Sequence, residues 1–394
     1  MTAHVIADDA EALAVAAELA EEFRARASRR DAERRLPLQE LDRLSASGLL
    51  AVTVPADHGG ADVRTGTLAE IFRLLGSADG SIAQIPQSHF VYVNVIRRHG
   101  TPEQQKFFFA ELLAGRRLGN AQSEAGTRHV QDIRTRLRRR PDGSYLLNGV
   151  KHYCTGALFA HWIPVLARAE DDTLHAAYVP RDAPGLGVVD DWDGMGQRTT
   201  ASGTVHLADV TVPADRVLPH HLTFRGPQLH GAFAQLLHAA IDTGIAESAL
   251  AEAAAFVRTK SRPWFESGVE AAADDPLLIQ RFGELALRVR AAEALLREAA
   301  RTVDAARDDL TDDSAAEASI AVAAAKVVAA QAAVEVSSAL FEVAGTRAAL
   351  RSLNLHRYWR DARTHTLHDP TRWKVQHIGR YVLNGTRPPR HGLL

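Results

Sequence analysis

Two histidines near the C-terminus, His365 and His368, are a pair whose residue type and spacing suit proton chemistry. Imidazole donates a hydrogen bond and changes its protonation near neutral pH. Residues three apart lie on one face of a helix, so the spacing predicts that both rings point the same way. No third ligand at a metal-site spacing and no HExxH motif accompanies the pair, so we expect no metal. The alternative is an ordinary helix end with two solvated histidines.

Other side chains that suit chemistry each have a structural alternative. His89 lies in residues 84–95, an apolar helical stretch where a lone histidine is as often a hydrogen-bonded core residue. Thr155 carries a hydroxyl close to the aromatic ring of Tyr153, and its alternative is an ordinary strand threonine. Cys154 has no neighbours that would lower the pKa of its thiol, so we expect it to pack and not to act as a nucleophile.

Several arginines suit a phosphate or a nucleic acid. Arg262 and Arg347 are candidates for binding a phosphate, which needs cations or helix N-termini, and their alternative is a helix cap. Arg134, Arg136 and residues 138–140 form a basic cluster. No aromatic residues interleave with this cluster, and the net charge of the chain is -2. We therefore expect a solvated face or a subunit contact, and no nucleic-acid partner.

Length and composition indicate the class of protein and its location. The 394 residues exceed what one hydrophobic core usually organises, so we expect two or three domains. One cysteine cannot form an internal disulfide, and the N-terminus shows no signal peptide, so we expect the cytoplasm. The most apolar stretch, residues 320–340, carries Lys326, Gln331 and Glu335, which makes it too polar for a bilayer, so we expect no membrane partner.

Hydrophobic periodicity predicts an α+β protein in three parts: an N-terminal α-helical domain at 1–115, a middle β domain at 116–220 and a C-terminal four-helix bundle at 221–394. Helices are expected in the first part at 12–23, 37–48, 67–75, 82–97 and 101–113, the last opened by a capping box at 101–104. Strands are expected at 145–147, 163–167, 176–179 and 204–207, with a hairpin turn at 141–143. Long helices are expected in the third part at 228–258, 276–307, 314–344 and 352–383.

This helical, β, helical order resembles the acyl-CoA dehydrogenase flavoprotein superfamily, and local motifs agree in order along nearly the whole chain. The motifs lie at residues 41–44, 48–50, 54–60, 119–124 with Gly126, 147–156, 196–198, 200–203 and 360–363. The resemblance implies the superfamily's fold, in which an N-terminal helical domain, a middle β-barrel and a C-terminal four-helix bundle follow one another.

The residues after the last motif depart from the dehydrogenases of the superfamily. Those enzymes usually place a base glutamate in a Tyr-Glu-Gly sequence there, whereas residues 364–370 read Thr-His-Thr-Leu-His-Asp-Pro. Asp369 stands in the place of the glutamate, one methylene shorter and followed by proline. The shorter side chain of Asp369 and the proline after it change where the carboxylate can lie, which argues against ordinary α,β-dehydrogenation of an acyl-CoA.

The same stretch, with Trp373-Lys374 and residues 383–392, resembles the two-component flavin monooxygenases of this fold, of the dibenzothiophene monooxygenase and sulfur-acquisition type. Such enzymes take reduced FMN from a separate NAD(P)H-dependent flavin reductase and form a C4a-hydroperoxyflavin with O2. They transfer one oxygen atom to the sulfur atom, or to another heteroatom, of a small substrate. No G-x-G-x-x-G follows a predicted strand, which agrees with electrons arriving from outside the chain. The resemblance further implies a homotetramer.

The resemblance also implies a set of site residues. The catalytic residues it implies are His89, Thr155 and His368. The cofactor-binding residues it implies are Asn120, Ser123, Tyr153, Thr155, Trp192, Arg262, Arg347 and His365. In the superfamily both arginines usually reach the flavin of a neighbouring subunit. Phe265 is followed by Glu266 where the dehydrogenases have Phe-Gly, which favours FMN over FAD.

Two alternatives to the monooxygenase stay open from the sequence. One is an FAD-dependent acyl-CoA dehydrogenase that uses Asp369 as its base and passes electrons to an electron-transfer flavoprotein. The other is a non-catalytic protein that keeps the flavin fold for binding. Flavin retention, together with turnover of an acyl-CoA or of reduced FMN and O2, separates the three.

Overall fold

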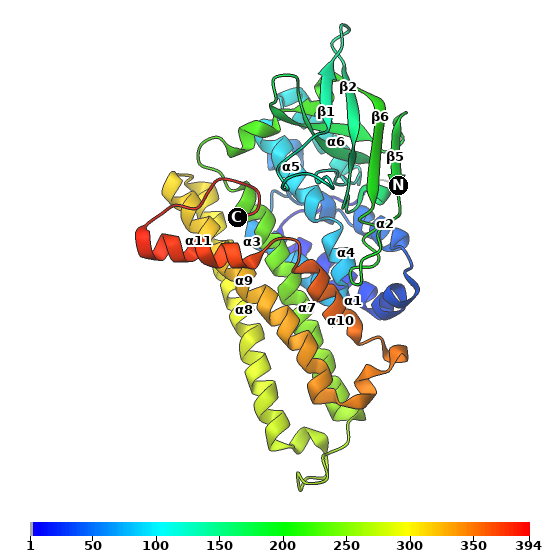
Figure 1. The fold of residues 1–394 in the computed structure, drawn as a ribbon, viewed down its shortest axis with the longest axis vertical. Helices are drawn as coiled ribbons and strands as arrows, with labels where there is room; N and C mark the ends of the chain where they lie inside the picture. The colour runs from blue at the N-terminus through cyan, green and yellow to red at the C-terminus, as the bar shows by residue number, and fades with distance from the viewer. Residues whose placement is uncertain (1–2) are drawn as a thin grey trace.

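The chain forms a helical part, a sheet and a set of long helices, with the sheet at one end of the molecule and the long helices extending to the other (Figure 1). The structure is a computed structural model and describes residues 3–394. The first part holds α1 (Asp9–Glu33), α2 (Leu38–Ala46), α3 (Thr65–Ala78), α4 (Gly80–Gln84), α5 (Gln87–His99) and α6 (Pro102–Leu113). The predicted α+β fold class is confirmed, and the domain boundaries at 115 and 220 stay predictions.

The helix ends of the first part follow local rules. At the start of α6 the Thr101 side chain accepts a hydrogen bond from the Gln104 N–H at 3.3 Å, and the Gln104 side chain accepts one from the Thr101 N–H at 2.9 Å. The predicted capping box is therefore confirmed. The prediction of a single helix over 82–97 is wrong, because Pro86 has no N–H and disfavours helical backbone before it, and the chain forms α4 and α5 instead.

The middle part is one mixed sheet of seven strands in the order β5-β6-β2-β1-β3-β4-β7. The strands are β1 (Arg136–Arg139), β2 (Tyr145–Lys151), β3 (Trp162–Arg168), β4 (Leu174–Pro180), β5 (Leu186–Val189), β6 (Thr204–Val212) and β7 (Val217–Leu218). All four predicted β runs lie in these strands, and the predicted turn at 141–143 joins antiparallel β1 and β2. Residues 118–121 run parallel to β3 and form bridges with Trp162 and Val165, so the segment after α6 lies beside the sheet.

The last part consists of long helices that pack closely. Its helices are α7 (His230–Lys260), α8 (Pro276–Asp308), α9 (Asp312–Ala344), α10 (His356–His365) and α11 (Thr371–Asn384). The helix predicted over 352–383 is interrupted, because Pro370 cannot continue a helix, and it forms α10 and α11. A Cβ on Gly244 of α7 would lie 2.3 Å from the carbonyl oxygen of Arg73 on α3, so glycine allows α3 and α7 to approach.

Helix α9 is long and apolar enough to cross a membrane by length and composition, with a mean hydropathy of 1.6 over its most apolar stretch. In the structure, 61% of that stretch is buried, and α9 packs against both α7 and α8. Its Lys326 is fully buried and pairs with Asp242 of α7. Burial of this kind is typical of a core helix in a globular protein.

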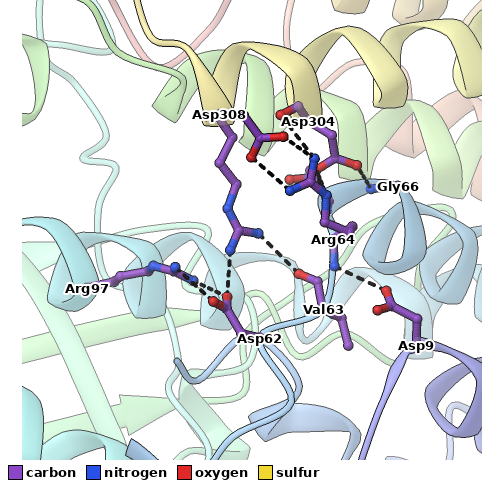
Figure 2. A network of polar contacts seen from close by, with 10 residues as sticks. Asp9, Asp62, Val63, Arg64, Gly66, Arg97, Asp304 and Asp308 are labelled. Atoms are coloured by element: carbon purple, nitrogen blue, oxygen red, sulfur yellow. Dashed lines mark hydrogen bonds and ion pairs between the residues drawn. The ribbon is translucent and has the colours of Figure 1, made fainter. Parts of the chain in front are cut away.

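A network of arginine and aspartate side chains joins the first part of the chain to α8 (Figure 2). Asp304, near the end of α8, accepts hydrogen bonds from the backbone N–H groups of Thr65 and Gly66 at 2.8 and 2.9 Å. These N–H groups belong to the first turn of α3, whose own N-cap residue, Arg64, makes no side-chain cap. Asp304 therefore caps α3 from a distant helix, and its negative charge faces the positive end of the α3 dipole.

Replacing Asp304 with alanine should lower the free energy of unfolding by about 1–2 kcal/mol, which is the usual cost of losing an N-cap. Denaturant unfolding followed by circular dichroism measures it. Asp308→Ala is the matched control, because Asp308 pairs with Arg64 on the surface at 2.6 Å, with its side chain 59% exposed. Its loss should cost less than about 1 kcal/mol. Equal losses in the two variants would contradict the capping role of Asp304.

Candidate active site

Two aromatic rings meet at the turn after β2. Tyr153 has a left-handed backbone, with φ of +59°, and its side chain is 61% exposed. Trp192 meets it edge to face, with ring centroids 6.4 Å apart, and the indole N–H donates to the carbonyl of Gln197 at 2.9 Å. Two predicted cofactor-binding residues, Tyr153 in the turn after β2 and Trp192 in the segment after β5, therefore lie side by side, with the ring of Tyr153 open to a ligand.

Asn120 lies next to this turn and has an unused acceptor. A Cβ on Gly119 would lie 2.9 Å from the Cα of Ala157, so only glycine lets the two segments approach this closely. The Oδ1 atom of Asn120 is buried and has no hydrogen-bond partner among the described residues. A buried acceptor without a partner costs free energy, so it suits a ligand that brings a donor. Ser123 is half-buried, and its carbonyl accepts the N–H of His152 at 2.9 Å.

Thr155 belongs to a chain of buried hydroxyl groups whose direction is fixed. The Thr200 hydroxyl donates to the carbonyl of Gln197 at 3.0 Å. Ser202 lies 2.7 Å from Thr200 and 2.7 Å from Thr155, so Ser202 must donate to Thr200, and Thr155 to Ser202. The Thr155 oxygen keeps its lone pairs for an N–H donor. Asp361 of α10 holds the end of the chain by accepting the Gln197 N–H at 2.6 Å.

A buried ion pair orders the loop that carries Ser123. The Lys151 ammonium is fully buried at the end of β2 and donates to Glu124 at 2.7 Å and to the carbonyl of Gln122 at 3.1 Å. Glu124 also accepts the N–H and the hydroxyl of Thr135. Burial alone would raise the pKa of Glu124, but Lys151 and Thr135 outweigh it and lower this pKa to about 2. The carboxylate is therefore ionised and acts as the fixed centre of the loop.

Between α7 and α10 lies a set of buried polar side chains around His365. The Nδ1 atom of His365 lies 2.6 Å from Oδ1 of Asp242, whose other oxygen accepts from Lys326 at 2.6 Å. The Nε2 atom of His365 lies 3.0 Å from Nδ1 of His238 and 3.1 Å from Oε1 of Gln84. Lys326 and Asp242 are fully buried, and each of the two histidines is 1% exposed.

His368 is not on the helix that carries His365. Helix α10 ends at His365, and His368 lies in the turn before Pro370, so the prediction that one helix face carries both rings is wrong. Its ring packs on His238 instead, with centroids 4.2 Å apart, and the side chain stays exposed. Desolvation of the ring by the surrounding protein is the largest cause that lowers the pKa of His368. Water at the exposed edge of the side chain weakens this effect.

The C-terminal end of α4 contacts both the residues around Thr155 and the residues around His365. Gln84 contacts His365, and a Cβ on Gly156 would lie 3.2 Å from the carbonyl of Ile85, the residue after α4. Gly156 directly follows Thr155. The structure therefore brings both His365 and the segment that carries Thr155 to the C-terminal end of α4.

His89 of α5 uses both of its ring nitrogens on the backbone. Its Nδ1 accepts the N–H of Leu118 at 3.0 Å, so Nε2 carries the proton and donates to the carbonyl of Leu50 at 2.8 Å. Burial lowers the pKa of His89 to about 4, which keeps the ring neutral. This is the arrangement of a hydrogen-bonded core histidine. His89 has no free nitrogen for a reacting atom, and it positions the segment that leads to Asn120.

Arg262 and Arg347 lie far from these residues within one chain. Both are exposed, and Arg347 donates to the carbonyl of Lys260, at the end of α7, at 2.8 Å. The helix from His238 to Lys260 is about 33 Å long at 1.5 Å per residue. Figure 1 shows the loop after α7 at the end of the molecule opposite the sheet. A single chain does not bring the two arginines to the other candidate residues.

Asp369 is not free to act as a base. It is 4% exposed and forms an ion pair with Lys374 of α11, which also donates to the carbonyl of Leu393 at 2.7 Å. Burial alone would raise the pKa of Asp369, but the ammonium groups of Lys326 and Lys374 outweigh it and hold this pKa below its usual value. A paired carboxylate of lowered pKa is a poor proton acceptor.

Cys154 is buried, and burial raises the pKa of its thiol to about 12, in agreement with a packing role. Within residues 3–394, no group of three or more His, Cys, Asp or Glu side chains is placed to hold a metal ion.

The sequence interpretation missed His238 and Asp242. They are four apart on α7 and so share a helix face, and a buried lysine within an alanine-rich helix, Lys326, was the available sign that a carboxylate must face it.

Comparison with protein-family models matches three acyl-CoA dehydrogenase domains: the N-terminal domain at residues 8–116, the middle domain at 120–210 and the C-terminal domain at 236–373. Dibenzothiophene monooxygenase from Rhodococcus erythropolis is 36% identical over 97% of this chain and 95% of its own length. The probable FMNH2-dependent monooxygenase SfnC from Pseudomonas putida is 32% identical over 96% of each chain. The crystal structure of FMN-bound TdsC from Paenibacillus sp. A11-2 superposes with a TM-score of 0.92 at 36% identity, covering 97% of this chain and 100% of TdsC.

Proposed function

The chain belongs to the acyl-CoA dehydrogenase family and is an FMN-dependent monooxygenase, and we propose that a separate flavin reductase supplies its reduced FMN and that its substrate is a small sulfur compound. The predicted monooxygenase function and FMN cofactor are thereby confirmed. The observation that supports the proposal is that the carboxylate at the dehydrogenase base position, Asp369, is paired with Lys374, while a histidine group and an unused acceptor on Asn120 are present. We assign the reaction to the cytoplasm, which suits the unpaired, buried Cys154.

The described residues fit FMN. Reduced FMN supplies two electrons, so that one oxygen atom of O2 reaches the substrate and the other leaves as water. The isoalloxazine ring of the reduced cofactor carries N–H donors, and Asn120 and Thr155 offer unused acceptors for them. Tyr153 and Trp192 provide aromatic surface beside these acceptors. Ser123 lies in the loop that Lys151 and Glu124 order, and we assign it to the ribityl chain and phosphate.

The histidines handle protons and exclude water. His368 is the exposed member of the group, so we assign it to donate a hydrogen bond to the reacting oxygen. His365 was predicted to contact the flavin, but both of its ring nitrogens face protein groups, so we assign it to hold the histidine group in place. Exclusion of water from the reacting atoms lets oxygen go to the substrate and not to peroxide, so we propose that bound substrate covers the exposed edge of His368.

The dehydrogenase alternative is disfavoured by Asp369. An acyl-CoA dehydrogenase needs a free carboxylate to take the substrate α-proton, whereas Asp369 is buried and paired with Lys374. The non-catalytic alternative predicts that no flavin binds, which the site chemistry above argues against.

We assign Arg262 and Arg347 to the FMN of a neighbouring subunit in a homotetramer. Their distance from Thr155 within one chain agrees with a role in trans. Exposed apolar side chains near these arginines and along α11 suit subunit contacts. They are Trp264, Phe265, Trp373, Val375, Val382 and Leu383.

Replacing Arg347 with alanine should raise the dissociation constant of FMN roughly 10- to 100-fold, since hydrogen bonds to charged groups contribute about 1.5–3 kcal/mol. Fluorescence titration of FMN measures it. Arg351→Ala is the matched control, because Arg351 is an exposed arginine four residues further along. The assignment of Arg347 is wrong if both variants bind FMN as the parent protein does.

The proposed function is tested with two reaction mixtures. One contains FMN, NADH, a flavin reductase, O2 and dibenzothiophene, and the other contains an acyl-CoA with FAD and a dye acceptor. We expect turnover in the first and none in the second. Turnover of the acyl-CoA alone would overturn the proposal in favour of the dehydrogenase, and failure to retain any flavin would favour a binding protein.

A further inference from the structure

The buried ion pair behind His365 lies in the core of the helical bundle, where it is costly to maintain. Lys326 and Asp242 are both fully buried, on α9 and α7. Replacing such a pair with apolar residues is often neutral or stabilising, so burial energy does not account for it. Among residues 3–394, the one further side-chain partner of this pair is His365, at 2.6 Å from Asp242.

Every side chain that faces a ring nitrogen of His365 offers a hydrogen-bond acceptor. Asp242 accepts at Nδ1, because Lys326 and His365 outweigh burial and hold the pKa of this carboxyl below its usual value. Gln84 Oε1 and His238 Nδ1 face the other nitrogen, Nε2, at 3.1 and 3.0 Å. Of these partners only His238 can also donate, because an imidazole changes tautomer and a carboxylate or amide oxygen does not. The proton between His365 and His238 can therefore lie on either ring.

His238 leads from this pair to the candidate active site. Its ring lies 4.2 Å from that of exposed His368, and 5.1 Å from that of His365. Burial, followed by the charges of His368 and His365, lowers the pKa of His238, which keeps its ring neutral at rest. The remaining charged groups around the three rings are Lys326, Asp242, Asp369 and Lys374.

We propose that His365 and His238 form a two-step proton relay behind His368, with Asp242 and Lys326 as the positioning residues that hold it. The relay rests on the proposed function, because the reacting oxygen at His368 is the group it serves. The forward step starts with His365 protonated on both ring nitrogens: its Nε2–H bond breaks, an Nδ1–H bond forms on His238, and the positive charge moves to His238. The Nε2–H bond of His238 then breaks, and the proton passes to solvent water beside the exposed ring of His368. This leaves His365 neutral, with its Nδ1–H on Asp242, and the reverse sequence restores its second proton.

The relay is tested in the flavin-free protein by 15N NMR of the histidine rings, with His365 assigned by the loss of its signals in His365→Gln. We expect Nδ1 of His365 to stay protonated from pH 5 to 9. At neutral pH, Asp242→Asn should decrease the fraction of His365 that is protonated on both ring nitrogens, because it removes a negative charge, and Lys326→Met should increase this fraction, because it removes a positive charge. Opposite effects of the two variants on His365 would show that Asp242 and Lys326 position it. Effects of the same sign, or no effect, would overturn the proposed role of this pair.

The double variant Asp242→Asn, Lys326→Met guards against misfolding, because it leaves no unpaired buried charge. We expect it to melt close to the parent protein and to lose the fixed Nδ1–H tautomer of His365. An unchanged tautomer would contradict the role of Asp242.

His238→Leu adds a test with the loaded enzyme. We expect the ratio of product to peroxide to fall at least tenfold, with the pH dependence of that ratio flattened, while FMN binding is kept. An unchanged pH profile would overturn the relay. A parent protein that forms no oxygenated product would instead sink the proposed function and leave the NMR result standing.

Discussion

Replacing His368 with alanine should abolish oxygenated product while reduced FMN is still oxidised and hydrogen peroxide is released. The imidazole is the exposed member of the histidine group and stacks on His238 at 4.2 Å between ring centroids. Loss of a positioned proton donor typically costs 10²- to 10⁴-fold in rate, so we expect product per flavin oxidised to fall by about a hundredfold or more. Product is measured by chromatography and peroxide by a coupled peroxidase assay.

The matched control for this variant is His206→Ala. His206 is exposed on β6, in the sheet, and takes no part in the histidine group. This control should couple flavin oxidation to product as the parent protein does, and both variants should keep the same melting temperature. Normal coupling in the His368 variant would remove His368 from the site.

Replacing Lys151 with methionine should destabilise the protein by about 3–5 kcal/mol, the cost of breaking a buried ion pair by removing one partner. Lys151 is fully buried, and its loss leaves Glu124 with hydrogen bonds but no cation. Because Glu124 orders the loop that carries Ser123, FMN affinity should fall as well. Denaturant unfolding and FMN titration measure the two effects.

The double variant Lys151→Met, Glu124→Gln separates charge from packing. It leaves no buried charge, so it should recover most of the lost stability. It should still bind FMN more weakly, because the amide cannot hold the loop as the ion pair does. If Lys151→Met unfolds like the parent protein, the ion pair is not a determinant of this loop.

Local sequence rules predicted most elements, and the errors have one cause. The capping box at α6 and the hairpin at residues 141–143 were predictable because each depends on a few adjacent residues. Pro86 and Pro370 break two predicted helices, because hydrophobic periodicity continues through a proline while backbone hydrogen bonding does not. The second break moves His368 off the helix of His365 and onto His238.

The site was predictable only where a motif or the resemblance pointed to it. Asn120, Thr155 and His365 were named in advance, and the structure adds the unused acceptors of the first two and the partners of the third. Asp242 was not predicted, because its role depends on Lys326, which lies 84 positions away in the sequence. His89 was predicted as catalytic, yet both of its nitrogens bind the backbone, a fact that only packing determines.

The central claim is that this chain transfers oxygen from O2, using reduced FMN made elsewhere, within a histidine-bounded site. The most direct measurement is mass spectrometry of the product formed under 18O2 from dibenzothiophene and a small set of other sulfur compounds. The account predicts that at least one of these compounds gains an oxygen atom that carries the heavy isotope, only when reduced FMN is supplied. Product oxygen that comes from water, or no oxygenation alongside efficient desaturation of an acyl-CoA, would contradict it.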